Sequence, residues 1–174
     1  MTNIFLTGQI QIGKSTVLQK TLDMIKSNTD CTFGGFRTYK IDKHRDVYIR
    51  EYNEPEMPDL EHKIATWCHD KMDCHDEVLN SFSNTLLESA EKADIIVLDE
   101  LGFLEKNSDS FKAAVFDCLN SGKPCVGILR KANIPWQKPI YDDPDTIIIE
   151  VTLANRNGIP YVIYEKIKQS INQK

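Results

Sequence analysis

The stretch from residue 5 to residue 16, FLTGQIQIGKST, most constrains what this chain can fold into. It matches the pattern G-x-x-x-x-G-K-[ST], the Walker A motif, in which a glycine-rich loop between a strand and a helix wraps around nucleotide phosphates. The context fits, because residues 4–6 predict a buried parallel strand and residues 15–26 place apolar side chains at helical spacing. A chance match in a strand–loop–helix corner is the alternative interpretation.

The residue types in this loop suit an anion. Gly8 and Gly13 let the backbone bend without interference from a Cβ atom, so that N–H groups and the positive end of the helix converge on phosphate oxygens. Lys14 is expected to reach the β and γ phosphates, Ser15 to offer its hydroxyl to Mg²⁺, and Thr16 to approach the α phosphate. The expected nucleotide-binding residues are Gly8, Gln9, Ile10, Gln11, Ile12, Gly13, Lys14, Ser15 and Thr16, with Arg37 from a later strand.

Composition narrows the class of protein. A chain of 174 residues, 41% hydrophobic, predicts one domain over residues 1–174. A net charge of −5 argues against a broad basic face for nucleic acid. The sequence has no apolar run long enough to span a membrane, and its five cysteines lack the spacing of a disulfide framework. These features predict a cytoplasmic protein.

Apolar periodicity predicts alternating strands and helices. The expected strands are residues 4–6, 31–41, 47–52, 93–100, 124–129 and 146–151, and the expected helices are residues 15–26, 76–92, 108–120 and one that opens at Pro160. The second and third strands predict a small antiparallel hairpin insert, whereas residues 53–73 and 130–144 predict loops. The predicted fold is α/β with three layers, a mainly parallel sheet with helices on both faces. Ligands of such sheets bind beyond the carboxyl ends of the strands.

Two acids close the near-continuous apolar strand at residues 93–100. Asp99 is expected to hold Mg²⁺ together with Ser15, because this ion prefers oxygen ligands beside the phosphates. Glu100 is placed to accept a hydrogen bond from water and aim it at the γ phosphorus. The alternative for Glu100 is a solvated charge at a strand end.

Phosphoryl transfer spreads negative charge over oxygen atoms, so cations besides Lys14 are expected near the site. Arg37, Arg130 and Arg156 lie near predicted strand ends or loops on that side. A lone arginine is commonly a surface ion-pair partner, which is the alternative for each. The expected catalytic residues are Glu100, Lys14, Arg130 and Arg156.

Two other features carry weaker signals. The Cys-His pairs at residues 68–69 and 74–75 match no structural zinc spacing, which disfavours a metal site there. Trp67 and Trp136 stand in loop-like sequence, where a packing role is favoured over base stacking.

Taken together, these stretches resemble the small P-loop nucleoside-triphosphatase family that includes a human cancer-related member. The sequence GGFRT at residues 34–38 matches its Gly-Gly-Phe-x-Thr, and DELGFLE at residues 99–105, followed by Ser108 and Phe111, keeps the spacing of its acidic strand motif. Residues 155–156 match its Asn-Arg pair. The resemblance implies a RecA-like fold and slow, Mg²⁺-dependent hydrolysis of ATP, GTP or other triphosphates with broad base tolerance.

By position, the resemblance implies that Lys14 and Ser15 bind phosphate and Mg²⁺, that Asp99 binds the metal, and that Glu100 orients water. The chain departs from the family at Gln11, where a glycine is usual, and at residues 67–75, which replace a Gly-Lys-Tyr-like stretch. The arginine and glycine usual in the hairpin are also absent. A kinase for a small acceptor and a nucleotide-gated interaction module are the competing hypotheses, although the Asn-Lys-x-Asp base reader of guanine switches does not occur.

Overall fold

The computed structural model describes residues 2–41, 45–68 and 71–172. Its strands are β1 (Asn3–Thr7), β2 (Phe33–Lys40), β3 (Val47–Glu51), β4 (Lys63–Cys68), β5 (Lys71–Cys74), β6 (Ile95–Leu101), β7 (Cys125–Leu129) and β8 (Thr146–Glu150). Its helices are α1 (Lys14–Asn28), α2 (Asp76–Lys92), α3 (Asp109–Asn120), the 3-10 turn η1 (Pro135–Gln137), α4 (Lys138–Asp142) and α5 (Ile159–Asn172). None of the helices in the described part combines the length and apolar character needed to cross a membrane.

The strands form one sheet in the order β5-β4-β3-β2-β6-β7-β1-β8. The five strands from β2 to β8 in this order are parallel, and β3, β4 and β5 extend the sheet antiparallel beyond β2. The mainly parallel α/β sheet is therefore confirmed. The antiparallel part differs from the predicted hairpin insert, because β2 belongs to the parallel strands and the antiparallel strands are β3, β4 and β5. The carboxyl ends of β1 and β6, which precede the two chemical motifs, lie at the same edge of the sheet.

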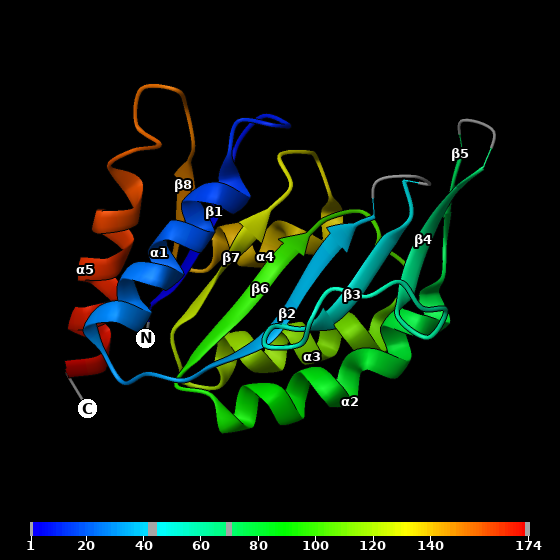
Figure 1. The fold of residues 1–174 in the computed structure, drawn as a ribbon, viewed down its shortest axis with the longest axis horizontal. Helices are drawn as coiled ribbons and strands as arrows, with labels where there is room; N and C mark the ends of the chain where they lie inside the picture. The colour runs from blue at the N-terminus through cyan, green and yellow to red at the C-terminus, as the bar shows by residue number, and fades with distance from the viewer. Residues whose placement is uncertain (1, 42–44, 69–70, 173–174) are drawn as a thin grey trace.

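Helices cover both faces of the sheet (Figure 1). The residues of β1 show how the layers form, because alternate side chains of a strand point to opposite faces. Ile4 and Leu6 pack into the cluster beneath α1 and α5, whereas Phe5 packs into the cluster beneath α2 and α3. All three are fully buried. The apolar run therefore marks a strand covered on both sides, which holds the loop that follows it on a rigid base.

Two expected loops contain regular structure. Residues 53–73 include β4 and much of β5, a hairpin in which Ala65 pairs with Cys74 and Trp67 with Met72. Residues 130–144 include η1 and α4. Both expectations were wrong because these elements are short and only one face of each is buried, which leaves too few apolar positions for a period to show.

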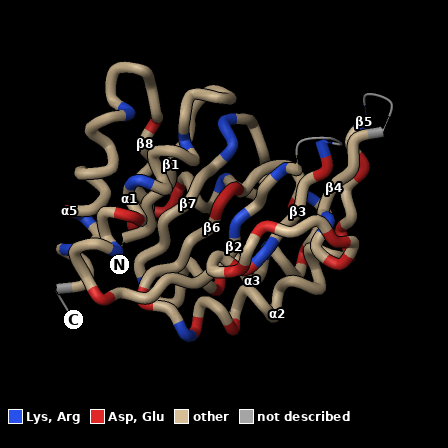
Figure 2. Tube along the Cα trace, in the orientation of Figure 1, with Lys and Arg blue, Asp and Glu red and all other residues tan. Residues whose placement is uncertain are grey.

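Charged residues of both signs are interspersed along the chain in Figure 2. The net charge of −5 is thus spread over the described part rather than collected on one element.

Candidate functional site

The loop between β1 and α1 bends as the glycine pattern predicts. Gly8 has φ +138° and Gly13 has φ +104°, values that residues with side chains rarely adopt. A Cβ atom on Gly8 would also stand 2.8 Å from the carbonyl oxygen of Val151. Alanine at this position would therefore push the loop away from the residue that follows β8. We call residues 8–15 the phosphate loop.

Gln11, where relatives of the resembled family have glycine, adopts φ +62°. The left-handed conformation costs a residue with a Cβ atom about 1–2 kcal/mol. The phosphate loop of this chain therefore keeps a glycine-like backbone at this position and stores local strain there.

Lys14, the first residue of α1, turns its side chain back into the phosphate loop. Its Nζ atom donates hydrogen bonds to the carbonyl oxygens of Gly8 (3.1 Å) and Gln9 (2.9 Å), and the residue is buried. An ammonium group has three N–H donors, so two fix its position and the third is available to a phosphate oxygen. The loop and its cation form one preorganised unit at the N-terminus of α1.

Ser15 and Asp99, which are far apart in the sequence, line the same cavity of about 430 Å³ between α1 and β2. We call it the metal-side cavity. Loss of hydration and the neighbouring charge of Glu100 raise the pKa of Asp99 to about 7, while Arg37 and Lys14 lower it. A hydroxyl and a crowded carboxylate are the hard oxygen donors that suit Mg²⁺, and a cation would relieve the carboxylate's lost hydration. These residues therefore fit a magnesium ion that arrives with a nucleotide.

Within residues 2–41, 45–68 and 71–172, no three or more His, Cys, Asp or Glu side chains are grouped so that they alone could hold a metal ion. Of the Cys-His pairs considered above, His69 lies outside the described residues. The imidazole Nε2 of His75 stands 3.3 Å from the hydroxyl of Thr66.

Glu100 follows Asp99 at the tip of β6, and its backbone N–H donates to the hydroxyl of Thr38 (3.3 Å). Glu100 lines a second, smaller cavity of about 90 Å³, together with Thr38, Glu105 and Arg130. The two acids thus line different cavities, which adjoin each other because Thr38 lines both.

The three candidate arginines lie at three different places. Arg37 lies opposite Asp99 on β2 and lines the metal-side cavity. Arg130 lines the second cavity, and its guanidinium lies 4.5 Å from the centre of the Phe103 ring. Arg156 lines a third cavity of about 250 Å³ beside Gly13. The structure brings Arg37 and Arg156 to two cavities that share Thr16, and it keeps Arg130 beside Glu100.

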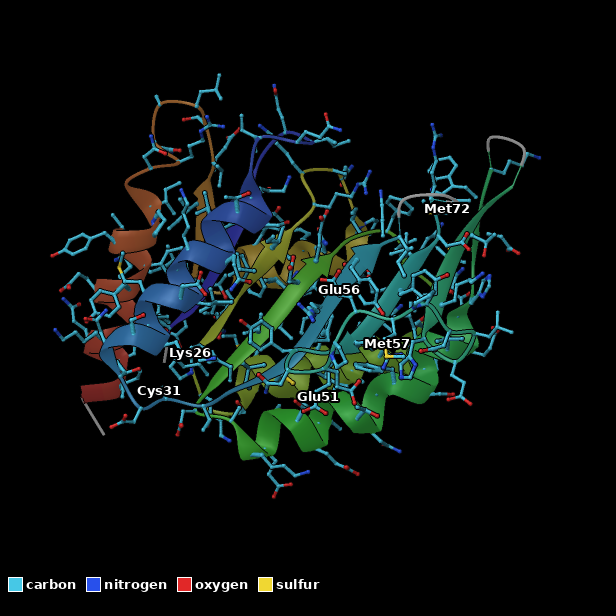
Figure 3. The ribbon with its side chains drawn as sticks, viewed as in Figure 1. Lys26, Cys31, Glu51, Glu56, Met57 and Met72 are labelled. Atoms are coloured by element: carbon cyan, nitrogen blue, oxygen red, sulfur yellow. The ribbon has the colours of Figure 1, made fainter. Side chains whose placement is uncertain are left out.

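Arg37 is held by residues 53–62, which we call the crossing segment. Its guanidinium donates to the carbonyl oxygen of Glu54 (2.5 Å) and pairs with the carboxylate of Glu56 (3.4 Å). Figure 3 shows Glu56 on this segment in front of the sheet, and Glu56 also lines the metal-side cavity. The segment is itself anchored by Tyr39, whose hydroxyl donates to the carbonyl of Met57 (2.8 Å).

Several residues at these cavities were not predicted. Tyr52 and Glu56 stand in or next to the stretch without periodicity, and they reach the site only through the pairing of β2 with β3. Thr38 and Glu105 do belong to the quoted family-like motifs, which was a usable signal. Trp136 packs against Phe116, as expected, but it also donates a hydrogen bond to the loop after β6.

Glu105 carries the site's most deeply buried charge, with a residue exposure of 1%. Burial raises its pKa to about 7 from 4.5, against the lowering effect of the Gly102 N–H that donates to it (2.7 Å). Between pH 4.5 and about pH 7, the Glu105 carboxyl keeps its proton in the folded state, whereas it has lost this proton in the unfolded chain. Glu105 therefore lowers stability progressively as the pH rises from about 4.5 to 7, by a total on the order of 3 kcal/mol.

We expect Glu105→Gln to remove this part of the pH dependence while keeping the acceptor for Gly102. The free energy of unfolding, measured with urea from pH 4 to pH 8, should rise in the variant relative to the parent above pH 5. Asp99 contributes with the same sign and stays in both proteins, so the difference between the two curves isolates Glu105. A difference that is constant across this pH range would contradict the prediction.

Known proteins resemble this chain in sequence and in fold. The model of a family described as NTPase matches residues 3–164. The nucleoside-triphosphatase THEP1 of Natranaerobius thermophilus is 27% identical over 178 residues, covering 98% of each chain. The crystal structure of THEP1 from Aquifex aeolicus superposes with a TM-score of 0.77 at 19% identity, over 96% of this chain and 99% of that one. The solution structure of a human cancer-related nucleoside triphosphatase superposes with a TM-score of 0.71 at 23% identity, over 98% of this chain and 99% of that one.

Proposed function

Because the chain belongs to the NTPase family and is a P-loop nucleoside-triphosphatase, we propose that it hydrolyses its substrate at the phosphate loop with Lys14, Ser15, Asp99 and Glu100. The observation that carries this proposal is that Ser15 and Asp99 line one cavity, with the charge of Lys14 near enough to lower the pKa of Asp99. The comparisons favour hydrolysis over the kinase and the interaction module.

In the proposed mechanism, the N–H groups of the phosphate loop and the third donor of Lys14 bind the β and γ phosphates. Ser15 and Asp99 would hold Mg²⁺, which would offset the charge that builds up on the phosphate oxygens. Glu100 accepts a hydrogen bond from the attacking water. This hydrogen bond keeps the lone pair of the water oxygen directed at the γ phosphorus. Thr38 steadies Glu100 through the backbone N–H.

We further propose that the third cavity takes the ribose and base. It adjoins the metal-side cavity, because Thr16 and Lys20 line both. Lys20 and Arg156 line it too, and the flat face of an arginine stacks on any base. This chemistry supports broad base tolerance. Arg37 on the metal side and Arg130 beside Glu100 are proposed as the further cations, and a cytoplasmic location stays a prediction.

Asp99→Asn tests the metal site. The amide has no charge to offer Mg²⁺, so we expect the Mg²⁺ concentration for half-maximal turnover to rise about 10-fold or more. The same variant should unfold at no lower temperature than the parent at pH 8, because a crowded carboxylate is removed. Asp117→Asn on the exposed face of α3 is the matched control and should change neither quantity. An unchanged Mg²⁺ requirement in Asp99→Asn would contradict the assignment.

A further inference from the structure

The two residues that follow Glu100 are held by side chains rather than by the sheet alone. The carbonyl oxygen of Leu101 accepts a hydrogen bond from Nε2 of Gln137 (2.9 Å) besides one from the backbone N–H of Arg130. The carbonyl oxygen of Gly102 accepts one from Nε1 of Trp136 (2.8 Å). Two neighbouring side chains of η1 thus donate to two successive peptide groups directly after the proposed water-orienting residue.

The sheet is irregular at this point. Along the pairing of β6 with β7, Leu98 stands opposite Gly127 and Leu101 stands opposite Leu129. Between these two pairs, β6 has two residues, Asp99 and Glu100, whereas β7 has only Ile128. Such irregularities re-aim side chains and interrupt the regular ladder of hydrogen bonds. The position of Glu100 consequently depends on what fixes the chain beyond it.

The donors themselves are fixed to the protein core. Gln137 is 1% exposed, and the Trp136 ring packs at 90° against the edge of Phe116 on α3, with ring centres 6.4 Å apart. Ile140 on α4 is buried in the same cluster. The short helical segment is thus a rigid support for the strand tip, as a precise catalytic geometry requires.

We propose that Gln137 and Trp136 are positioning residues for Glu100. Their hydrogen bonds fix the peptide groups of Leu101 and Gly102 on one side of Glu100, and Thr38 fixes its N–H on the other. The carboxylate is thereby kept on the line of attack of the water. This inference rests on the proposed role of Glu100, and it adds residues to that role from a segment to which no motif drew attention.

The chemistry of Gln137 singles out its donor as what distinguishes it from an apolar side chain at the same position. Its Oε1 atom is buried and finds no hydrogen-bond partner among the described residues. Burying an amide with an unpaired oxygen costs free energy, and an apolar side chain of the same length would fill the same buried position without that cost. What an apolar side chain lacks is the donor to Leu101.

Gln137→Met and Trp136→Phe test the proposal, because each keeps the packing volume and removes one donor. We expect kcat for ATP hydrolysis with saturating Mg²⁺ to fall about 10-fold in each variant, with KM within about twofold of the parent. The unfolding temperature of Gln137→Met should stay within a few degrees, since one bond and one unsatisfied acceptor are lost together. Trp67→Phe, at an exposed position on β4, is the matched control and should leave kcat unchanged.

Repeating Gln137→Met in a Glu100→Gln background decides whether it acts through Glu100. Positioning predicts less than a twofold further loss of kcat, because the group that was being aimed is already disabled. A full 10-fold further loss, or an unchanged kcat in both single variants, would overturn the inference while leaving the role of Glu100 intact. If Glu100→Gln itself turned over at the parent rate, the role of Glu100 and the inference would fall together, and hydrolysis by other residues would stand.

Discussion

Replacing Lys14 with alanine is expected to weaken the binding of a non-hydrolysable triphosphate with Mg²⁺ at least about 100-fold. The ammonium is buried and already oriented by the carbonyls of Gly8 and Gln9, so its contact with phosphate forms without further ordering. The phosphate charge would then face the rim of carbonyl oxygens with no cation between them. Isothermal titration calorimetry measures the loss directly.

Lys26→Ala is the matched control for this experiment. Lys26 lies in the last turn of the same helix and is exposed, at the end remote from the phosphate loop (Figure 3). Its removal should leave affinity within about twofold of the parent, because an exposed charge at that distance is screened by salt. Circular dichroism checks that α1 persists in both variants. An affinity for Lys14→Ala within threefold of the parent would refute the assignment of the phosphate loop.

Glu100→Gln is expected to keep nucleotide affinity and lower kcat about 100-fold or more. The amide has nearly the shape of the carboxylate but accepts a proton or a hydrogen bond from water much less well. Nothing in the proposed binding contacts uses Glu100, so the dissociation constant should stay within about twofold. Single-turnover release of phosphate separates the chemical step from product release.

Glu88→Gln on the exposed face of α2 controls for the change of charge, and it should turn over at the parent rate. A Glu100→Gln variant as fast as this control would remove Glu100 from the mechanism. Loss of affinity together with kcat would instead assign it to binding.

The parts of the site that the sequence predicted are those encoded by neighbouring residues. The phosphate loop needs glycines and a lysine at fixed spacing, and the acids of β6 follow a run of buried apolar residues, so both leave a local pattern. Tyr52 and Glu56 reach the metal-side cavity only because β3 pairs with β2 in one register. Register depends on contacts across the whole sheet, which no short stretch records.

The supports of the site were harder to predict for a second reason. Gln137 and Trp136 donate to backbone carbonyls, and a carbonyl is present at every residue. A hydrogen bond of this kind therefore constrains only one of its two partners in the sequence. The elements β4, β5 and α4 were missed because each is too short to show a period.

The crossing segment and the phosphate loop belong to regions of unequal stability. The loop follows a strand buried on both faces, whereas residues 53–62 connect β3 to β4 in the antiparallel extension of the sheet and are fixed mostly by side chains near the surface. Local opening begins where few buried contacts must break. We therefore expect residues 53–62 to open locally at a lower free-energy cost than the phosphate loop, so that the segment can move while β1 and α1 stay folded.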